Sequence, residues 1–105
     1  MADFDKSVDS TAAVAEERAY DVPPSGLVIF FNDDYTTKDF VVEVLVSVFH
    51  KSEAEANALM EAVHTNGSAA IGVYAFDIAA TRASIAVSRA RAQGFPLMVK
   101  VQEIR

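Results

Sequence analysis

The chain has 105 residues, no cysteine and a formal net charge of −6. Without cysteine it forms no disulfide and has no catalytic thiol, and its few scattered basic residues do not suit nucleic acid. No apolar run approaches the ~20 residues that a membrane-spanning helix needs, and the acidic start is unlike a secretory signal. These features predict one cytoplasmic, monomeric domain without cofactor, metal, membrane or nucleic-acid partner.

Residues 1–25 differ in composition from the rest of the chain. They contain few large apolar residues and end in Pro23-Pro24-Ser25. Six acidic residues stand against Lys6 and Arg18: Asp3, Asp5, Asp9, Glu16, Glu17 and Asp21. Such a segment cannot bury much apolar surface. We therefore expect a flexible acidic tail over residues 1–25 and a folded domain over residues 26–105, and composition leaves open whether the tail has a function or only aids solubility.

The folded part should begin with a strand and a helix. "LVIFF", Leu27–Phe31, is a continuous β-branched and aromatic run that is typical of a central strand. An apolar stripe of helical spacing follows, made of Phe40, Val41, Val44, Leu45, Val48 and Phe49. Thr36 is predicted to cap this helix, with Asp39 three residues later in a capping-box position.

A second helix and a second strand come next. Ser52 and Glu55 have capping-box spacing, and Asn66-Gly67 supplies the stop signal. The apolar stripe between them consists of Ala56, Leu59, Met60 and Val63. "AAIGVYAF", Ala69–Phe76, is predicted to be a strand, and Gly72 within it indicates a bulge or a close approach of another backbone.

A long third helix is expected from about Asp77 to Gln93, ended by Gly94 and Pro96. Its small-residue face consists of Ala79, Ala83, Ala86 and Ala90. "PLMVKVQEI" then alternates as a final strand. The order β-α-α-β-α-β without long crossovers predicts an α+β domain, with a three-stranded antiparallel sheet and three helices on one face.

Catalytic motifs are missing from the sequence. There is no Gly-x-Ser-x-Gly elbow and no glycine-rich phosphate loop. His50 and His64 do not have the spacing of a metal pair. Asp33 and Asp34 are a possible acid–base pair, but adjacent residues at a strand end usually point apart. We therefore predict that the chain is not an enzyme.

Two polar features stand beside apolar runs. Asn32, Asp33 and Asp34 follow the first strand directly, and His64 follows Val63 on the second helix. Taken separately, the first feature fits a cap or an Asx-turn and the second fits a satisfied boundary residue. The residues alone do not join the two features.

A resemblance to a known family joins them. The stretch from Leu27 to the C-terminus resembles ClpS, the bacterial adaptor of the N-end rule. The resemblance rests on "NDDYT" at residues 32–36, Met60 followed by Ala62-Val63-His64, Gly67, "GVY" at residues 72–74, Ile78-Ala79 and Pro96-Leu97. It implies the three-stranded antiparallel fold that the pattern predicts.

The resemblance also implies a function. ClpS proteins bind other proteins through an N-terminal Leu, Phe, Tyr or Trp and deliver them to the Clp AAA+ ATPase (ClpA-like) and its protease, with a flexible N-terminal segment assisting delivery. By the family pattern, the substrate amine is bound by Asn32, Asp34 and His64, with Asp33 as the less certain carboxylate. The apolar pocket comprises Thr36, Lys38, Val41, Met60, Val63 and Leu97, and the ATPase-docking surface includes Asp77, Thr81 and Arg82.

The sequence departs from the family at the pocket. Lys38 stands where many members have a methionine, and Thr37 stands where they have a proline. Either Lys38 alters the preference for the N-terminal side chain or it is a solvated lysine without effect. The alternative function is a modulator of Clp ATPase substrate choice that binds such N-termini weakly or differently.

Overall fold

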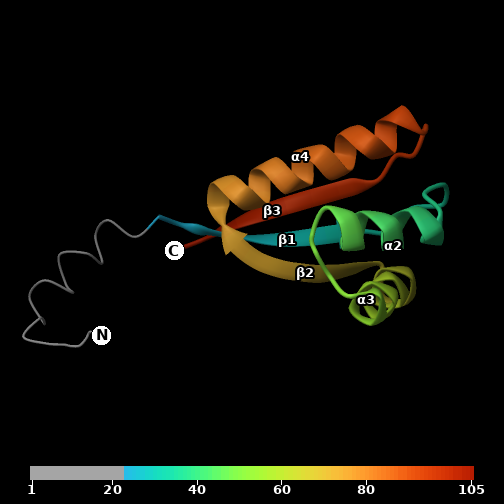
Figure 1. Cartoon of the computed structure of the whole chain (residues 1–105), viewed down its shortest axis with the longest axis horizontal. Helices are drawn as coiled ribbons and strands as arrows, with labels where there is room; N and C mark the ends of the chain where they lie inside the picture. Colours follow the sequence, from blue (N-terminus) through green and yellow to red (C-terminus); the bar gives the residue numbers. More distant parts are fainter. Residues whose placement is uncertain (1–22) are drawn as a thin grey trace, which may run out of the picture.

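A computed structural model describes residues 23–105 of the chain, and its elements follow the predicted order (Figure 1). They are β1 (Ser25–Phe31), α2 (Lys38–Ser47), α3 (Glu53–Asn66), β2 (Ser68–Ala75), α4 (Phe76–Ala92) and β3 (Met98–Ile104). The strands form one antiparallel sheet in the order β2-β1-β3. This confirms the α+β prediction and the central place of the first strand. Residues 1–22, most of the expected tail, lie outside the described residues.

The helices bury one face of the sheet. Along β1, Val28 and Phe30 are fully buried, while the alternate residues Leu27 and Ile29 are only partly buried. The Phe30 ring meets Phe49 edge-on, with ring centroids 5.5 Å apart. Helix α4 runs along the sheet (Figure 1), and its four predicted small residues are buried against the core: Ala79, Ala83, Ala86 and Ala90.

Two glycines adapt the sheet to its neighbours. Val28 pairs with Gly72 and Ile29 pairs with Ala70, so Ile71 is the extra residue of a bulge, as Gly72 predicted. At Gly26 a Cβ atom would lie 2.8 Å from the Cβ of Ala79. Helix α4 therefore crosses directly over Gly26, which the sequence did not single out.

The capping residues at the starts of α2 and α3 agree with the prediction for one helix and not for the other. Ser52 and Glu55 form the full capping box of α3, and Gly67 ends that helix with a left-handed φ of 88°. The prediction that Thr36 caps α2 is wrong, because Thr37 Oγ1 accepts the Phe40 N–H at 3.1 Å. Thr36 instead donates its hydroxyl to Asp33. The shift of one residue also takes Asp39 out of the capping-box position.

The apolar stripe of α2 extends beyond the helix. The helix ends at Ser47, yet Val48 and Phe49 remain buried in the core. His50 then takes a left-handed φ of 58°, and the Lys51 N–H donates to Leu45 O at 3.0 Å. The chain thus reverses sharply at His50, which places this residue on the surface between α2 and α4.

Candidate functional site

One pocket of about 250 Å³ opens where the end of β1 meets the start of α2 and the end of α3. Its lining consists of Asn32, Asp33, Asp34, Thr36, Lys38, Val41, Met60, Val63 and His64. All nine residues belong to the set that the sequence analysis named for the amine and its side chain. Leu97 is not among these lining residues; it is 1% exposed within the core that Val41, Met60 and Val63 also belong to.

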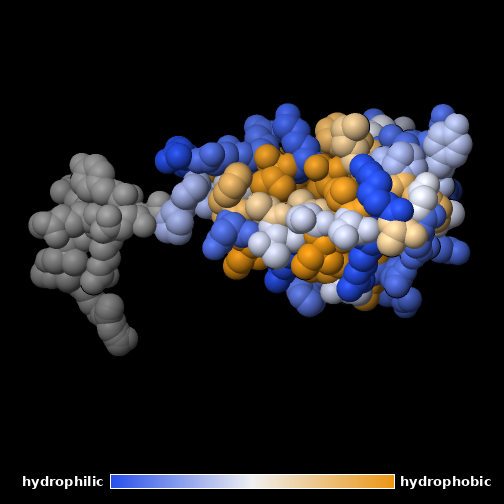
Figure 2. All heavy atoms as spheres, turned by 90° about the horizontal axis from the view of Figure 1, so that it is seen from above, coloured by the Kyte–Doolittle hydropathy of each residue, from blue (hydrophilic) through white to orange (hydrophobic). Residues whose placement is uncertain are grey.

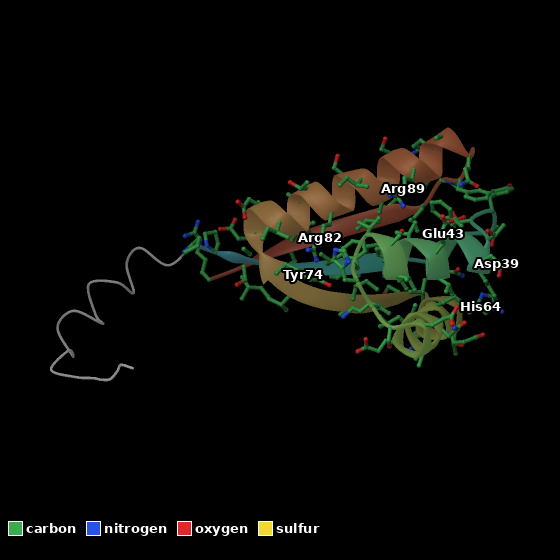
Figure 3. All side chains as sticks on the ribbon, in the orientation of Figure 1. Asp39, Glu43, His64, Tyr74, Arg82 and Arg89 are labelled. Carbon is green, nitrogen blue, oxygen red and sulfur yellow. The ribbon has the colours of Figure 1, made fainter. Side chains whose placement is uncertain are left out.

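A backbone contact brings the two separated segments together. The Asn32 N–H donates to Gly67 O at 2.9 Å, which ties the end of β1 to the end of α3. Gly67 can make this turn because its positive φ carries no penalty for glycine. His64 on the last turn of α3 therefore lies at the same end of the molecule as the start of α2 (Figure 3).

The Asp33 carboxylate stabilises the loop itself. Its Oδ1 accepts the N–H groups of Tyr35 (2.8 Å) and Thr36 (2.7 Å), and its Oδ2 accepts the Thr36 hydroxyl (2.7 Å). Partial burial raises the pKa of Asp33, but the hydrogen bonds from Thr36 and Tyr35, with the charge of Arg91, outweigh burial and hold this pKa below its ordinary value of 3.8. Asp33 therefore orders the loop that presents its neighbours.

This geometry predicts an acid-sensitive contribution to stability. A carboxylate whose pKa is lower in the folded state stabilises the fold above its unfolded pKa and loses that contribution as the pH falls through the folded pKa. We expect Asp33→Asn to be less stable than the parent at pH 6, by no more than about 1 kcal/mol because the group is partly exposed. Urea titrations at pH 6 and pH 3 should show this difference shrinking at the lower pH, and a constant difference would contradict the assignment.

Three other polar side chains at the pocket have free lone pairs. Asn32, Asp34 and His64 are exposed, and within residues 23–105 their side chains form no hydrogen bond or ion pair. Asp34 can only accept when ionised, and Asn32 and a neutral His64 each offer one acceptor. The wall beside them is apolar, since Val41, Met60 and Val63 are each at most 9% exposed. The site therefore offers converging acceptors for a cation next to an apolar recess.

Lys38 adds a cation to this pocket. It is the first residue of α2, and its Nζ lies 4.0 Å from Oε2 of Glu61 on α3. Both side chains are more than half exposed, at 51% and 59%, so the pair contributes little to stability. It links the two helices that form the pocket walls, and no local sequence pattern points to Glu61.

Residues 23–105 offer neither a metal cluster nor a membrane-spanning helix. Within residues 23–105, no group of three His, Asp or Glu side chains is arranged to hold a metal ion. No helix in that part of the chain is long and apolar enough to cross a membrane.

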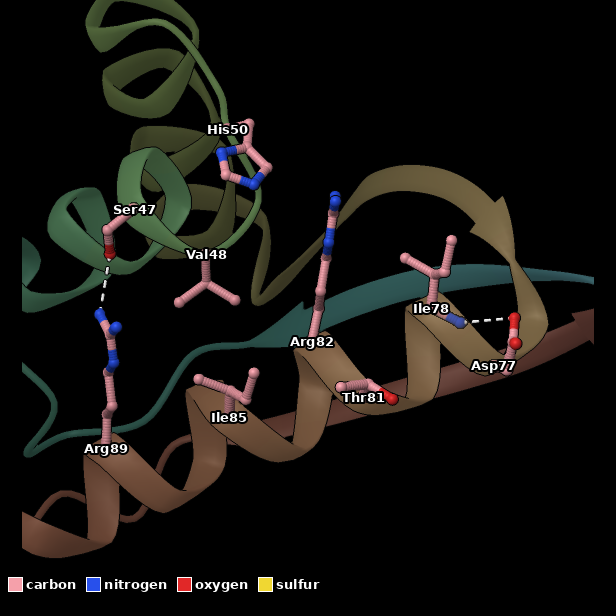
Figure 4. Close-up of a pocket in the computed structure, with 9 residues that line it drawn as sticks. All are labelled: Ser47, Val48, His50, Asp77, Ile78, Thr81, Arg82, Ile85 and Arg89. Atoms are coloured by element: carbon pink, nitrogen blue, oxygen red, sulfur yellow. Dashed lines mark hydrogen bonds between the residues drawn. The ribbon is translucent and has the colours of Figure 1, made fainter.

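A second groove, of about 380 Å³, lies between α4 and the end of α2 (Figure 4). The predicted docking residues Asp77, Thr81 and Arg82 all line it, and the remaining lining residues are Ser47, Val48, His50, Ile78, Ile85 and Arg89. Apolar surface is visible on the α4 side of the molecule (Figure 2), and Ile78 and Ile85 are 45% and 41% exposed. The spacing of Ile78, Arg82, Ile85 and Arg89 on one helical face was the signal that could have extended the prediction.

Comparisons with known proteins agree on one family. The family model for ClpS, the ATP-dependent Clp protease adaptor protein, matches residues 21–100. The ATP-dependent Clp protease adapter protein ClpS of Nitratidesulfovibrio vulgaris is 48% identical over 77 residues, which are 73% of this chain and 74% of that protein. The protein of the same name from Oleidesulfovibrio alaskensis is 39% identical over 104 residues, which are 99% of this chain and 100% of that protein.

The structural comparison gives the same result. Agrobacterium tumefaciens ClpS2, solved bound to L-phenylalaninamide, matches with a TM-score of 0.75 and 39% sequence identity. The match covers 78% of this chain and 99% of that chain.

Proposed function

Because the chain belongs to the ClpS family of ATP-dependent Clp protease adaptor proteins, we propose that it binds proteins with an N-terminal Leu, Phe, Tyr or Trp and delivers them to a Clp AAA+ ATPase–protease in the cytoplasm. In this role it acts by binding and catalyses no reaction. The observation that carries the proposal is the pocket in which free acceptors on two segments surround an apolar recess. The bound L-phenylalaninamide of the Agrobacterium relative supports it, because that ligand combines a free amine with an aromatic side chain.

The amine explains the polar half of the pocket. A free α-amino group has a pKa of about 7.7 to 8.0, so it is mostly an ammonium at pH 7. It offers three donors and no acceptor, and it therefore needs acceptors from several directions. Asn32 Oδ1, the Asp34 carboxylate and an unprotonated nitrogen of His64 supply them. Asp33 contributes indirectly, because both of its oxygens already accept hydrogen bonds from Tyr35 and Thr36.

The apolar half binds the side chain of the N-terminal residue. Burial of a Leu or Phe side chain against Val41, Met60 and Val63 contributes about 1.5 to 3 kcal/mol. Each hydrogen bond to the charged amine contributes about 1.5 to 3 kcal/mol, and association costs several kcal/mol in lost freedom. The balance corresponds to dissociation constants of the order of micromolar, which suits an adaptor that must release its cargo.

Paired peptides test this proposal directly. Two fluorescent peptides that begin with Phe and differ only in a free or an acetylated N-terminus are titrated with the full chain, and anisotropy is measured. The free peptide should bind at about micromolar concentrations and the acetylated one at least tenfold more weakly. Acetylation removes the ammonium that donates a charged hydrogen bond to Asp34. Equal binding of both peptides, or a peptide with N-terminal Ser binding as well as the Phe peptide, would refute the amine-and-side-chain model.

The second groove is proposed to contact the ATPase. Asp77, Thr81 and Arg82 place charged and polar groups around exposed apolar side chains, and such a mixed surface suits a transient interface. One observation favours a second candidate function, a modulator of the ATPase with weak or altered N-terminus binding. Lys38 puts a cation at the pocket where an ammonium is to bind. If the chain binds no such peptide but still associates with the ATPase, the modulator function is the correct one.

Lys38→Met should change the peptide preferences. The substitution removes a cation beside the incoming ammonium and adds apolar surface, so we expect affinity for free Phe and Leu peptides to rise about two- to tenfold. Glu61→Gln is the matched control, because it leaves Lys38 in place but removes its partner at 4.0 Å. It should weaken binding, more at low than at high salt. Unchanged affinities and an unchanged ranking of the peptides in Lys38→Met would assign Lys38 to the solvated surface.

A further inference from the structure

The groove between α2 and α4 has the chemistry of a receptor for an acidic segment. Within residues 23–105, neither Arg82 nor Arg89 forms an ion pair with a carboxylate. Arg82 lies over the Tyr74 ring at 5.1 Å, and Arg89 donates to Ser47 Oγ at 2.9 Å. Figure 4 shows both side chains rising from α4 beside the groove, with Ile85 between them on the helix. Two guanidinium groups without a carboxylate partner beside exposed apolar side chains favour an occupant with carboxylates and a few apolar residues.

The chain itself supplies such a segment at the right place. The Phe76 N–H donates to Pro24 O at 2.9 Å, so Pro24 lies beside the first turn of α4. The groove begins on that same turn, at Asp77 and Ile78. Residues 14–21 read VAEERAYD and combine three carboxylates and one cation, Arg18, with a valine and a tyrosine, which leaves the segment with a net negative charge.

The distances along α4 agree with those that the segment upstream of Pro24 can span. With a rise of about 1.5 Å per residue, Arg82 lies about 9 Å and Arg89 about 20 Å along α4 from Phe76. An extended chain covers about 3.3 Å per residue, so Asp21 reaches about 10 Å and Glu17 about 23 Å from Pro24. Asp21 and Glu17 can therefore come opposite Arg82 and Arg89 respectively.

We propose that residues 14–21 bind this groove within the same molecule and cover it. Such short connections give effective concentrations in the millimolar range, so a contact that is weak between separate molecules is substantially occupied here. A stronger partner for the groove displaces the segment. The consequence that the segment competes with ATPase docking rests on the proposed function, whereas the intramolecular contact does not.

A paramagnetic label tests the contact, because the chain has no cysteine and one introduced residue is a unique attachment site. The full chain with Ala13→Cys carries a nitroxide, and amide signal intensities are compared between its oxidised and reduced forms. Signals of residues 82–89 on α4 and 47–50 at the end of α2 should lose at least half of their intensity, and those of residues 60–64 should not. Glu16→Lys with Glu17→Lys, or 0.5 M salt, should restore the intensity.

Two substitutions on the folded part complete the test. Arg89→Gln removes a cation of the groove and should restore the intensities by at least twofold. Lys100→Gln removes the same charge from an exposed position on β3 and should leave the broadening unchanged. Broadening that is absent, spread over the whole surface, centred on residues 60–64 or insensitive to these charges would overturn the proposal. Neither a peptide nor an ATPase is present, so such a failure would leave the proposed function untouched.

Discussion

Asp34→Asn should weaken the binding of a peptide with a free N-terminal Phe by about ten- to hundredfold and leave the stability of the fold nearly unchanged. Asp34 is exposed, and within residues 23–105 its carboxylate has no hydrogen-bond donor or cation to lose. In the proposed complex it accepts a charged hydrogen bond, worth about 1.5 to 3 kcal/mol. Each 1.4 kcal/mol corresponds to a factor of ten in affinity. Anisotropy titrations and urea denaturation measure the two quantities on the same samples.

Asp33→Asn is the matched control, since it removes the same charge from the adjacent residue. Its carboxylate is occupied by Tyr35 and Thr36, and the amide that replaces it keeps one acceptor oxygen for their N–H groups. We expect less than about a threefold loss of peptide affinity and a measurable loss of stability at pH 6. Equal losses of affinity in both variants would mean that only the total negative charge near the pocket matters. Asp34 would then not be a direct ligand of the amine.

Much of this fold could be predicted from local patterns. The β-branched run of β1, the capping box at Ser52 and the left-handed Gly67 each follow from interactions within a few residues. The start of α2 could not be placed as well, because Thr36 and Thr37 have equal capping ability. The choice between them depends on Asp33, which takes the Thr36 hydroxyl and leaves Thr37 for the helix.

The candidate site needed information that local patterns do not contain. Asn32 and His64 come together only because the Asn32 N–H pairs with Gly67 O across the fold, and the family resemblance rather than spacing predicted that meeting. Leu97 was also carried over from the family pattern; it is 1% exposed within the core, and its role in the pocket stays a prediction. The pairing of Lys38 with Glu61 depends on how α2 and α3 pack, which neither periodicity nor family motifs express.

The core beneath the pocket gives the largest expected effect on stability. Phe30 is fully buried on the helix-covered face of β1, and its ring packs edge-on against Phe49, whose ring lies 6.0 Å from that of Tyr74. Phe30→Ala removes this contact and leaves a cavity, which should cost about 3 to 5 kcal/mol of unfolding free energy. That is a large part of the 5 to 15 kcal/mol typical of a domain, so the milder Phe30→Leu is measured beside it and should cost about 1.5 kcal/mol.

Phe31→Ala is the matched control, because it removes the same ring one residue later from the opposite, half-buried face of β1. It should cost about 1 to 2 kcal/mol, since part of its surface is already in water. Urea denaturation followed by circular dichroism measures all three variants. If Phe31→Ala cost as much as Phe30→Ala, a second layer would cover the other face of the sheet in solution. A smaller cost would show that one layer of helices supports β1, and with it the strand end from which Asn32 and Asp34 extend.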